Sequence, residues 1–221
     1  MPILFYGDPH GVFAPLVAAC AEARPDHVVI VGDLELARPL TEELAPVLAL
    51  GARCWYVLGN HDCDTEECYD FLVGDHPEGN IGGRVVEMPC REGLVRVAGL
   101  GGVYKGRIWN PRVDAEPKFR TREEFMRHCR PSNRWRGGLP LGQRDTIFPE
   151  DHRADRRADI LVTHEAPSTH PFGVAVIDDL AVALGARRIV HGHLHVGYTA
   201  ETRGVAVHGL DGRQTLLLPA A

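Results

Sequence analysis

The sequence lacks the long apolar segments of membrane proteins, since no run of about 18 apolar residues occurs in its 221 residues. Its start, MPILFYGD, has no basic stretch followed by a long apolar one, so we predict no signal peptide. Its six cysteines form no C-x-x-C pair, which favours a reducing compartment over a disulfide framework. We therefore expect a cytoplasmic protein without membrane contact, and no protein partner is implied.

Acidic residues outnumber basic ones overall, but positive charge is concentrated in one segment. The chain carries a net charge of −6, whereas residues 104–157 hold 14 Lys and Arg against 8 Asp and Glu. This segment also loses hydrophobic periodicity and gains Pro, Gly and Arg, so we interpret it as a cap-like insertion in a single domain spanning 1–221. A solvated arginine-rich face accounts for the charge alone; attraction of an anionic substrate is the alternative.

Short apolar runs and helix-like segments alternate in the first 60 residues. The runs are too short and too rich in β-branched and aromatic residues for helices. They are ILFYGD (3–8), HVVIVGD (27–33) and RCWYVLGN (53–60). Helical patterns at 13–23 and 39–50 separate them, and Asp8, Asp33 and Asn60 are spaced by about one strand-helix-strand unit. The pattern predicts a parallel sheet at whose carboxyl edge these three residues converge.

Further helices and strands are predicted from capping residues and from patterns of apolar residues. A helix is predicted from Asp64, whose side chain would cap it with Glu67, to Gly74, and a second one begins at Thr121 with a capping box to Glu124. Further strands are predicted at 84–89, 94–102, 158–164, 187–195, 204–209 and 215–219, and a helix at 176–186.

Polar residues accumulate where the predicted strands end. In chain order the motifs are Asp8-x-His10, Gly32-Asp33, Gly59-Asn60-His61-Asp62, His164 and Gly192-His193-x-His195. Carboxylate, imidazole and amide oxygen are the ligand types that zinc, manganese and iron accept. Glycine beside each ligand allows close approach of the backbone. The series predicts a metal site at the edge of the sheet.

With these motifs the sequence resembles the calcineurin-like metallophosphoesterase superfamily, in its bacterial type. The family's motifs are Asp-x-His, Gly-Asp-x-x-Asp, Gly-Asn-His-Asp/Glu, a lone His and Gly-His-x-His, in that order. The resemblance implies a four-layer α-β-β-α sandwich with two divalent metal ions. It assigns Asp8, His10, Asp33 and His195 to one metal and Asn60, His164 and His193 to the other, with Asp33 bridging both.

The second motif departs from the family pattern. It reads GDLELAR, so the family's second Asp falls on Leu36, with Glu35 one place early, and Arg38 has the wrong spacing for the Asp-Arg pair of protein Ser/Thr phosphatases. Because Asp33 is intact, metal binding is still expected, whereas a protein-phosphatase specificity is not.

Two adjacent metal ions would lower the pKa of a bridging water and clamp phosphoryl oxygens during in-line attack. Of manganese, iron and zinc, manganese is favoured. The leaving group then needs a proton, and His61, which follows a ligand without being one, is the predicted general acid. Asp8, Asp62 or Asp64 would keep it protonated, although Asp62 and Asp64 would equally serve to cap a helix.

These features predict a phosphoesterase acting on mono- or diesters, with a phosphorylated small molecule, nucleotide or nucleic acid as substrate. Candidate substrate contacts are Lys105, Arg107, Arg112, Arg134, Arg136 and His170. Trp109 and Trp135 lie among the basic residues of the insertion and would stack a base. The alternative is an inactive scaffold that binds a partner protein, but such scaffolds lose ligands or His61. A metallo-β-lactamase site is excluded because Val196 and Gly197 follow His193-x-His195.

Overall fold

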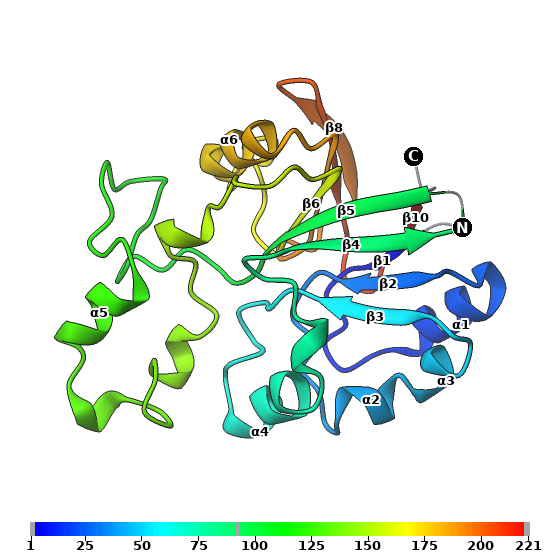
Figure 1. Cartoon of the computed structure of the whole chain (residues 1–221), viewed down its shortest axis with the longest axis horizontal. Helices are drawn as coiled ribbons and strands as arrows, with labels where there is room; N and C mark the ends of the chain where they lie inside the picture. The colour runs from blue at the N-terminus through cyan, green and yellow to red at the C-terminus, as the bar shows by residue number, and fades with distance from the viewer. Residues whose placement is uncertain (1–2, 92, 219–221) are drawn as a thin grey trace.

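The structure is a computed structural model that describes residues 3–91 and 93–218 (Figure 1). Its first sheet contains the three predicted N-terminal strands and the last strand of the chain. The spatial order is β10 (Thr215–Leu218), β1 (Ile3–Tyr6), β2 (His27–Ile30) and β3 (Arg53–Tyr56). β1, β2 and β3 are parallel, as predicted, and β10 pairs antiparallel with β1. The parallel strands deliver the motifs that follow them to one edge.

The second sheet combines four parallel strands with an antiparallel strand at each edge. Its order is β4 (Val85–Cys90), β5 (Gly93–Leu100), β6 (Ile160–Thr163), β7 (Arg188–His191), β9 (Val205–Gly209) and β8 (Tyr198–Thr202). β4 forms a hairpin with β5, and β8 pairs with β9. β6 and β7 end directly before His164 and before the Gly192-His193-x-His195 motif, so the second sheet brings these histidines to its own carboxyl edge.

The two sheets pack face to face, and helices cover their outer faces (Figure 1). Alternate residues of β1 show why: Ile3 and Phe5 belong to the apolar layer between the sheets, whereas Leu4 and Tyr6 pack under the helices. The first sheet is covered by α1 (Ala14–Ala23), α2 (Leu40–Glu43), α3 (Ala45–Leu48) and α4 (Glu66–Tyr69), and the second by α6 (Ala175–Leu184). The predicted four-layer α-β-β-α sandwich is confirmed.

Several sequence-based expectations were wrong in detail. The helix predicted at 39–50 is the pair α2 and α3, because Pro46 has no N–H to continue the hydrogen-bond ladder. The cap of α4 is Thr65, whose side chain accepts from the Cys68 N–H, and not Asp64; a π-helical turn, Asp70–Gly74, continues α4. β8 was missed because its polar sequence, YTAET, does not read as a buried strand.

The insertion, residues 104–157, extends from the body beyond the carboxyl end of β5 (Figure 1). It contains α5 (Arg122–His128) and 3-10 turns at Pro131–Asn133, Leu141–Gln143 and Pro149–Asp151; another 3-10 turn, Pro77–Gly79, precedes β4. Its small apolar cluster is made by Ile108, Phe125, Cys129 and Phe148. Thr121 caps α5 as predicted, but the Glu124 carboxylate accepts from the Arg120 N–H instead of closing the capping box on Thr121.

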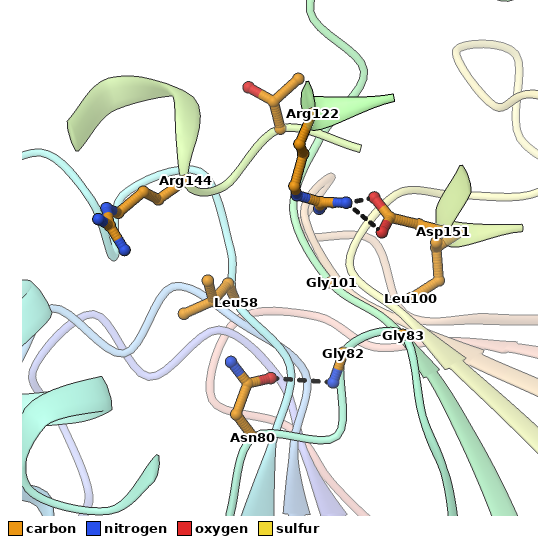
Figure 2. Close-up of a pocket in the computed structure, with 10 residues that line it drawn as sticks. Leu58, Asn80, Gly82, Gly83, Leu100, Gly101, Arg122, Arg144 and Asp151 are labelled. Atoms are coloured by element: carbon orange, nitrogen blue, oxygen red, sulfur yellow. Dashed lines mark hydrogen bonds and ion pairs between the residues drawn. The ribbon is translucent and has the colours of Figure 1, made fainter. Parts of the chain in front are cut away.

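A small cavity of about 100 Å³ lies where the insertion meets the body (Figure 2). Figure 2 shows Arg122 paired through two nitrogens with the Asp151 carboxylate, while Asn80 accepts from the Gly82 N–H on the opposite wall. The two insertion residues neutralise each other within the insertion, whereas Arg144, which also lines the cavity, donates to the Tyr69 hydroxyl of the body at 3.1 Å. None of the six cysteines forms a disulfide, and no helix in the described part of the chain is long and apolar enough to cross a membrane.

Candidate metal centre

Three loops that follow parallel strands share an unusual backbone conformation. In each, two residues separated by one position adopt positive φ, the left-handed region that residues other than glycine rarely enter. The six residues are Asp8 and His10, Asp33 and Glu35, and His193 and His195, with φ between 31° and 70°. Strain of this kind, repeated at one edge, is typical of a functional site. Glu35 is the second residue with positive φ in its loop, the position that His10 and His195 occupy in the other two loops.

These loops and β6 bring two groups of potential ligand atoms together. One group is His10, Asp33 and His195, the other is Asp33, His164 and His193, and within each group the ligand atoms lie within 4.8 Å of one another. The Nε2 atoms of His10 and His195 are 3.0 Å apart, and the rings of His164 and His193 have centroids 4.8 Å apart. Asp33 is common to both groups, which is the arrangement that a bridging carboxylate requires.

Asn60 and Asp33 both face His164. The Asn60 Oδ1 atom is 3.1 Å from His164 Nε2, and the Asp33 Oδ2 atom is 3.4 Å from the same nitrogen. The other Asp33 oxygen accepts from the His61 N–H at 2.9 Å. Burial tends to raise the pKa of Asp33, but the bond and charge of His164 outweigh it, and the pKa lies well below 3.8. Asp33 is therefore a carboxylate at neutral pH.

Asp8 supplies a test of whether the residues present suit a metal ion. Its side chain is fully buried, and its Oδ2 atom accepts from the His193 N–H at 3.0 Å. Its Oδ1 atom has no hydrogen-bond partner among the described residues, although a buried oxygen without a partner is costly. Burial raises the pKa of Asp8 above 3.8. A carboxylate with one orphaned oxygen, whose Oδ1 lies near His164 and whose Oδ2 lies near His195, fits a site for a cation.

The second ring nitrogens of two histidines are held by acceptors, which directs the remaining nitrogens to the site. The His164 Nδ1–H donates to the Val31 carbonyl at 2.7 Å, and the His10 Nδ1–H donates to the Glu35 carboxylate at 3.1 Å. Such partners fix the tautomer of metal-ligating histidines. Burial tends to lower the pKa of His164, but Asp33 and Asp8 raise it to about 9. A proton and a cation would thus compete for the same nitrogen.

His61 lies on the rim of the centre, with its ring centroid 5.8 Å from that of His10. Its Nδ1–H donates to the Asp64 carboxylate at 2.8 Å, and a Glu35 oxygen lies 3.7 Å from the same nitrogen. The bond to Asp64 raises the pKa of His61 above 6.5; burial opposes this, and the charges of Asp33 and Glu35 add to it. Of the carboxylates considered as partners of His61, Asp64 makes the contact.

Asp62 has a structural role instead. It is buried and accepts from the backbone N–H groups of Leu34 at 2.7 Å and Gly59 at 2.8 Å, so it joins the loops after β2 and β3. Sequence analysis did not select Glu35 as a functional residue, because Glu35 was compared only with the second Asp of the family motif and lies one position before it. Its signal was the same i, i+2 spacing as in Asp8-x-His10 and His193-x-His195.

The motif glycines pack directly against neighbouring ligands. A Cβ atom added to Gly59 would lie 2.1 Å from the Asp33 Oδ1 atom, and one added to Gly192 would lie 2.5 Å from Asp8 Oδ2. At Gly32 a Cβ would lie 2.3 Å from His164 Nδ1. The glycine of one motif thus makes room for the candidate ligand of another.

Most of the basic side chains considered as substrate contacts have partners inside the protein. Lys105 pairs with Asp145, Arg107 lies over the Phe125 ring, Arg134 donates to the Met126 and Cys129 carbonyls, and Arg136 pairs with Asp70. Trp135 contacts Tyr69, Arg136 and Arg144, and Trp109 contacts Tyr104 and His152. His170 lies near Tyr198 and belongs to neither ligand group. Arg112 contacts Glu165, the residue after His164.

Comparisons with known proteins agree with this fold. An uncharacterized protein of Haemophilus influenzae is 37% identical over 204 residues, 91% of this chain and 86% of the relative. A Thermus thermophilus structure has a TM-score of 0.58 at 14% identity and covers 98% of this chain and 97% of its own. The phosphopantetheinyl hydrolase of Mycobacterium tuberculosis gives 0.57 at 18%, covering 96% and 90%, and a dimetal phosphatase of Danio rerio gives 0.52 at 12%, covering 96% and 87%.

Fold and site together define an α-β-β-α sandwich protein with grouped His and Asp side chains at the carboxyl edges of its sheets. The family model for calcineurin-like phosphoesterases matches residues 1–197. The chain belongs to that family.

Proposed function

We propose that the protein is a phosphoesterase that uses two divalent metal ions, with manganese favoured, to hydrolyse phosphate mono- or diesters of small molecules or nucleotides. The observation that carries the proposal is the pair of ligand groups that share Asp33, together with the orphaned oxygen of Asp8. Asp8, His10, Asp33 and His195 would hold one ion, and Asp33, Asn60, His164 and His193 the other. Bound ions would supply Lewis acidity toward phosphoryl oxygens and activate water.

The residues of this chain provide the rest of the chemistry. His61 acts as the proton donor to the leaving group: its Nδ1–H is held by Asp64, so the exchangeable acidic proton is carried at Nε2. Its raised pKa favours the protonated ring near neutral pH. Glu35 orients His10 for metal binding and adds negative charge beside His61. One carboxylate thus supports both the ligand role of His10 and the proton-donor role of His61.

The test compares the protein with its His61→Ala variant, both loaded with manganese. The wild type should hydrolyse aryl phosphates, and the variant should lose roughly 10² to 10⁴ in kcat on an ester with a poor leaving group, the range ascribed to general acid catalysis. On an activated aryl ester the loss should be much smaller, and metal content should be unchanged. If the wild type binds two metals yet cleaves neither mono- nor diesters across a nucleotide panel, the inactive-scaffold alternative replaces the proposal.

A further inference from the structure

Arg112 differs from the other basic residues of the insertion in how its charge is placed. One Nη atom donates to the Glu165 carboxylate at 3.3 Å, and the side chain is 39% exposed. Within residues 3–91 and 93–218, the structure shows no partner for its Nε and second Nη atoms. Lys105, by contrast, places its ammonium 2.6 Å and 2.8 Å from the two oxygens of a buried carboxylate. Arg112 therefore retains donors that no described residue occupies.

Glu165 holds Arg112 beside the metal centre. It follows His164 directly in the chain, and its side chain is only 4% exposed. The carboxylate oxygen that is not bonded to Arg112 accepts from the Tyr104 N–H at 3.1 Å, so the carboxylate is fixed from two sides. This contact ties the beginning of the insertion to the end of β6.

Glu165 links Arg112 to the second ligand group, since Glu165 is the neighbour in sequence of His164, a member of that group. An anion bound between the metal centre and the insertion would meet this guanidinium.

We propose that Arg112 binds a phosphate oxygen of the substrate next to the metal centre, with Glu165 as its positioning residue. The inference rests on the proposed function and deepens it by naming what the insertion recognises, a phosphate group. The planar guanidinium presents parallel N–H donors that match phosphate oxygens, which a lysine at this place does not. Because the side chain is more than a third exposed, solvent weakens the contact, and we expect an effect of about tenfold on phosphate affinity.

The primary test measures the dissociation constant of inorganic phosphate by isothermal titration calorimetry, with manganese-loaded protein. Arg112→Gln should weaken binding about tenfold. Arg127→Gln is the matched control, since Arg127 also lies in the insertion, is 67% exposed and pairs with Glu123, one turn away on α5. It should bind phosphate as the wild type does. Equal affinity in the two variants overturns the inference.

A double-mutant cycle tests the role of Glu165. Glu165→Gln should weaken phosphate binding in the wild-type background and add no further loss in Arg112→Gln, because it acts only through the guanidinium. Additive losses, with metal content unchanged, would contradict the positioning role. A fall in unfolding free energy for Arg112→Gln without a change in phosphate affinity would identify a purely structural ion pair and also overturn the inference.

Steady-state kinetics distinguish which phosphate is bound. A rise in KM for Arg112→Gln with both a phosphomonoester and a nucleoside diphosphate places the contact on the reacting group, and a rise confined to the diphosphate places it on the second phosphate; both support the inference. Arg112-dependent phosphate binding in a protein that hydrolyses no ester would refute the proposed function and leave the inference standing.

Discussion

Gly192→Ala should weaken metal binding, although glycine is not a ligand. A Cβ atom at this position would lie 2.5 Å from the Asp8 Oδ2 atom and 2.7 Å from Oδ1. Carbon and oxygen approach to about 3.3 Å even in the closest favourable contacts, so the carboxylate must move by roughly 0.8 Å. The φ of Gly192 is not in the positive range, so the substitution acts through this contact and not through backbone strain.

The expected magnitude follows from the buried position of Asp8. Overpacking of a tightly packed site typically costs about 1–3 kcal/mol, or a few degrees in Tm for a chain of this length. Displacing a ligand, like removing a group that orients it, should lower metal affinity roughly 10- to 100-fold. Manganese affinity by calorimetry and urea unfolding measure the two effects separately.

The matched control is Gly142→Ala. Gly142 lies in the insertion, an added Cβ would have no atom within 4 Å, and its φ is −70°. This variant should retain both metal affinity and stability. If Gly192→Ala binds manganese as tightly as Gly142→Ala, the packing of Gly192 on Asp8 does not govern the site and the reasoning is refuted.

Two further predictions concern Asp33 and His27. Asp33→Asn should lower occupancy at both metal positions, by at least about tenfold in affinity, and metal analysis that finds loss at only one would contradict the bridging role. His27 accepts from the Trp55 Nε1–H and donates from Nε2 to the Pro89 carbonyl, and burial lowers its pKa below 6.5. Its contribution to stability is therefore complete well above pH 6.5 and is lost as the pH falls from 6.5 through the lowered pKa of the folded protein, because the unfolded chain binds the proton more readily in that range. His27→Gln, which can make both bonds without titrating, should flatten this fall in urea unfolding with chelator present; an unchanged slope would exclude the role.

The convergence of the strand-end motifs could be predicted from the sequence because each motif follows a short apolar strand. Val28 to Ile30 in β2 and Ile160 to Val162 in β6 are buried on both faces of their sheets, which produces continuous apolar runs that stop at a polar residue. Parallel pairing then brings the residues after the strands to one edge. The strand-helix-strand spacing thus indicated both the sheet and the convergence of Asp8, Asp33 and Asn60.

The partners of these residues could not be predicted, since they come from elsewhere in the chain. Asp62 and Asp64 are equivalent in sequence terms, yet Asp62 is buried under the loops while Asp64 faces His61. Thr65 replaced Asp64 as the helix cap because the Thr65 side chain reaches the Cys68 N–H. Likewise, only packing showed that Arg136 pairs with Asp70 on the helical segment after α4, whereas Arg112 is held at the end of β6.

The sequence by itself determined the layered fold, the strand-end series of metal-ligand types and the basic character of the insertion, because local patterns of apolar and polar residues encode them. Tertiary structure decided the left-handed loops that make Glu35 a counterpart of His10, the packing of motif glycines on candidate ligands of other motifs, and which partner each arginine of the insertion has. These depend on distances between segments far apart in the chain, which no local pattern records.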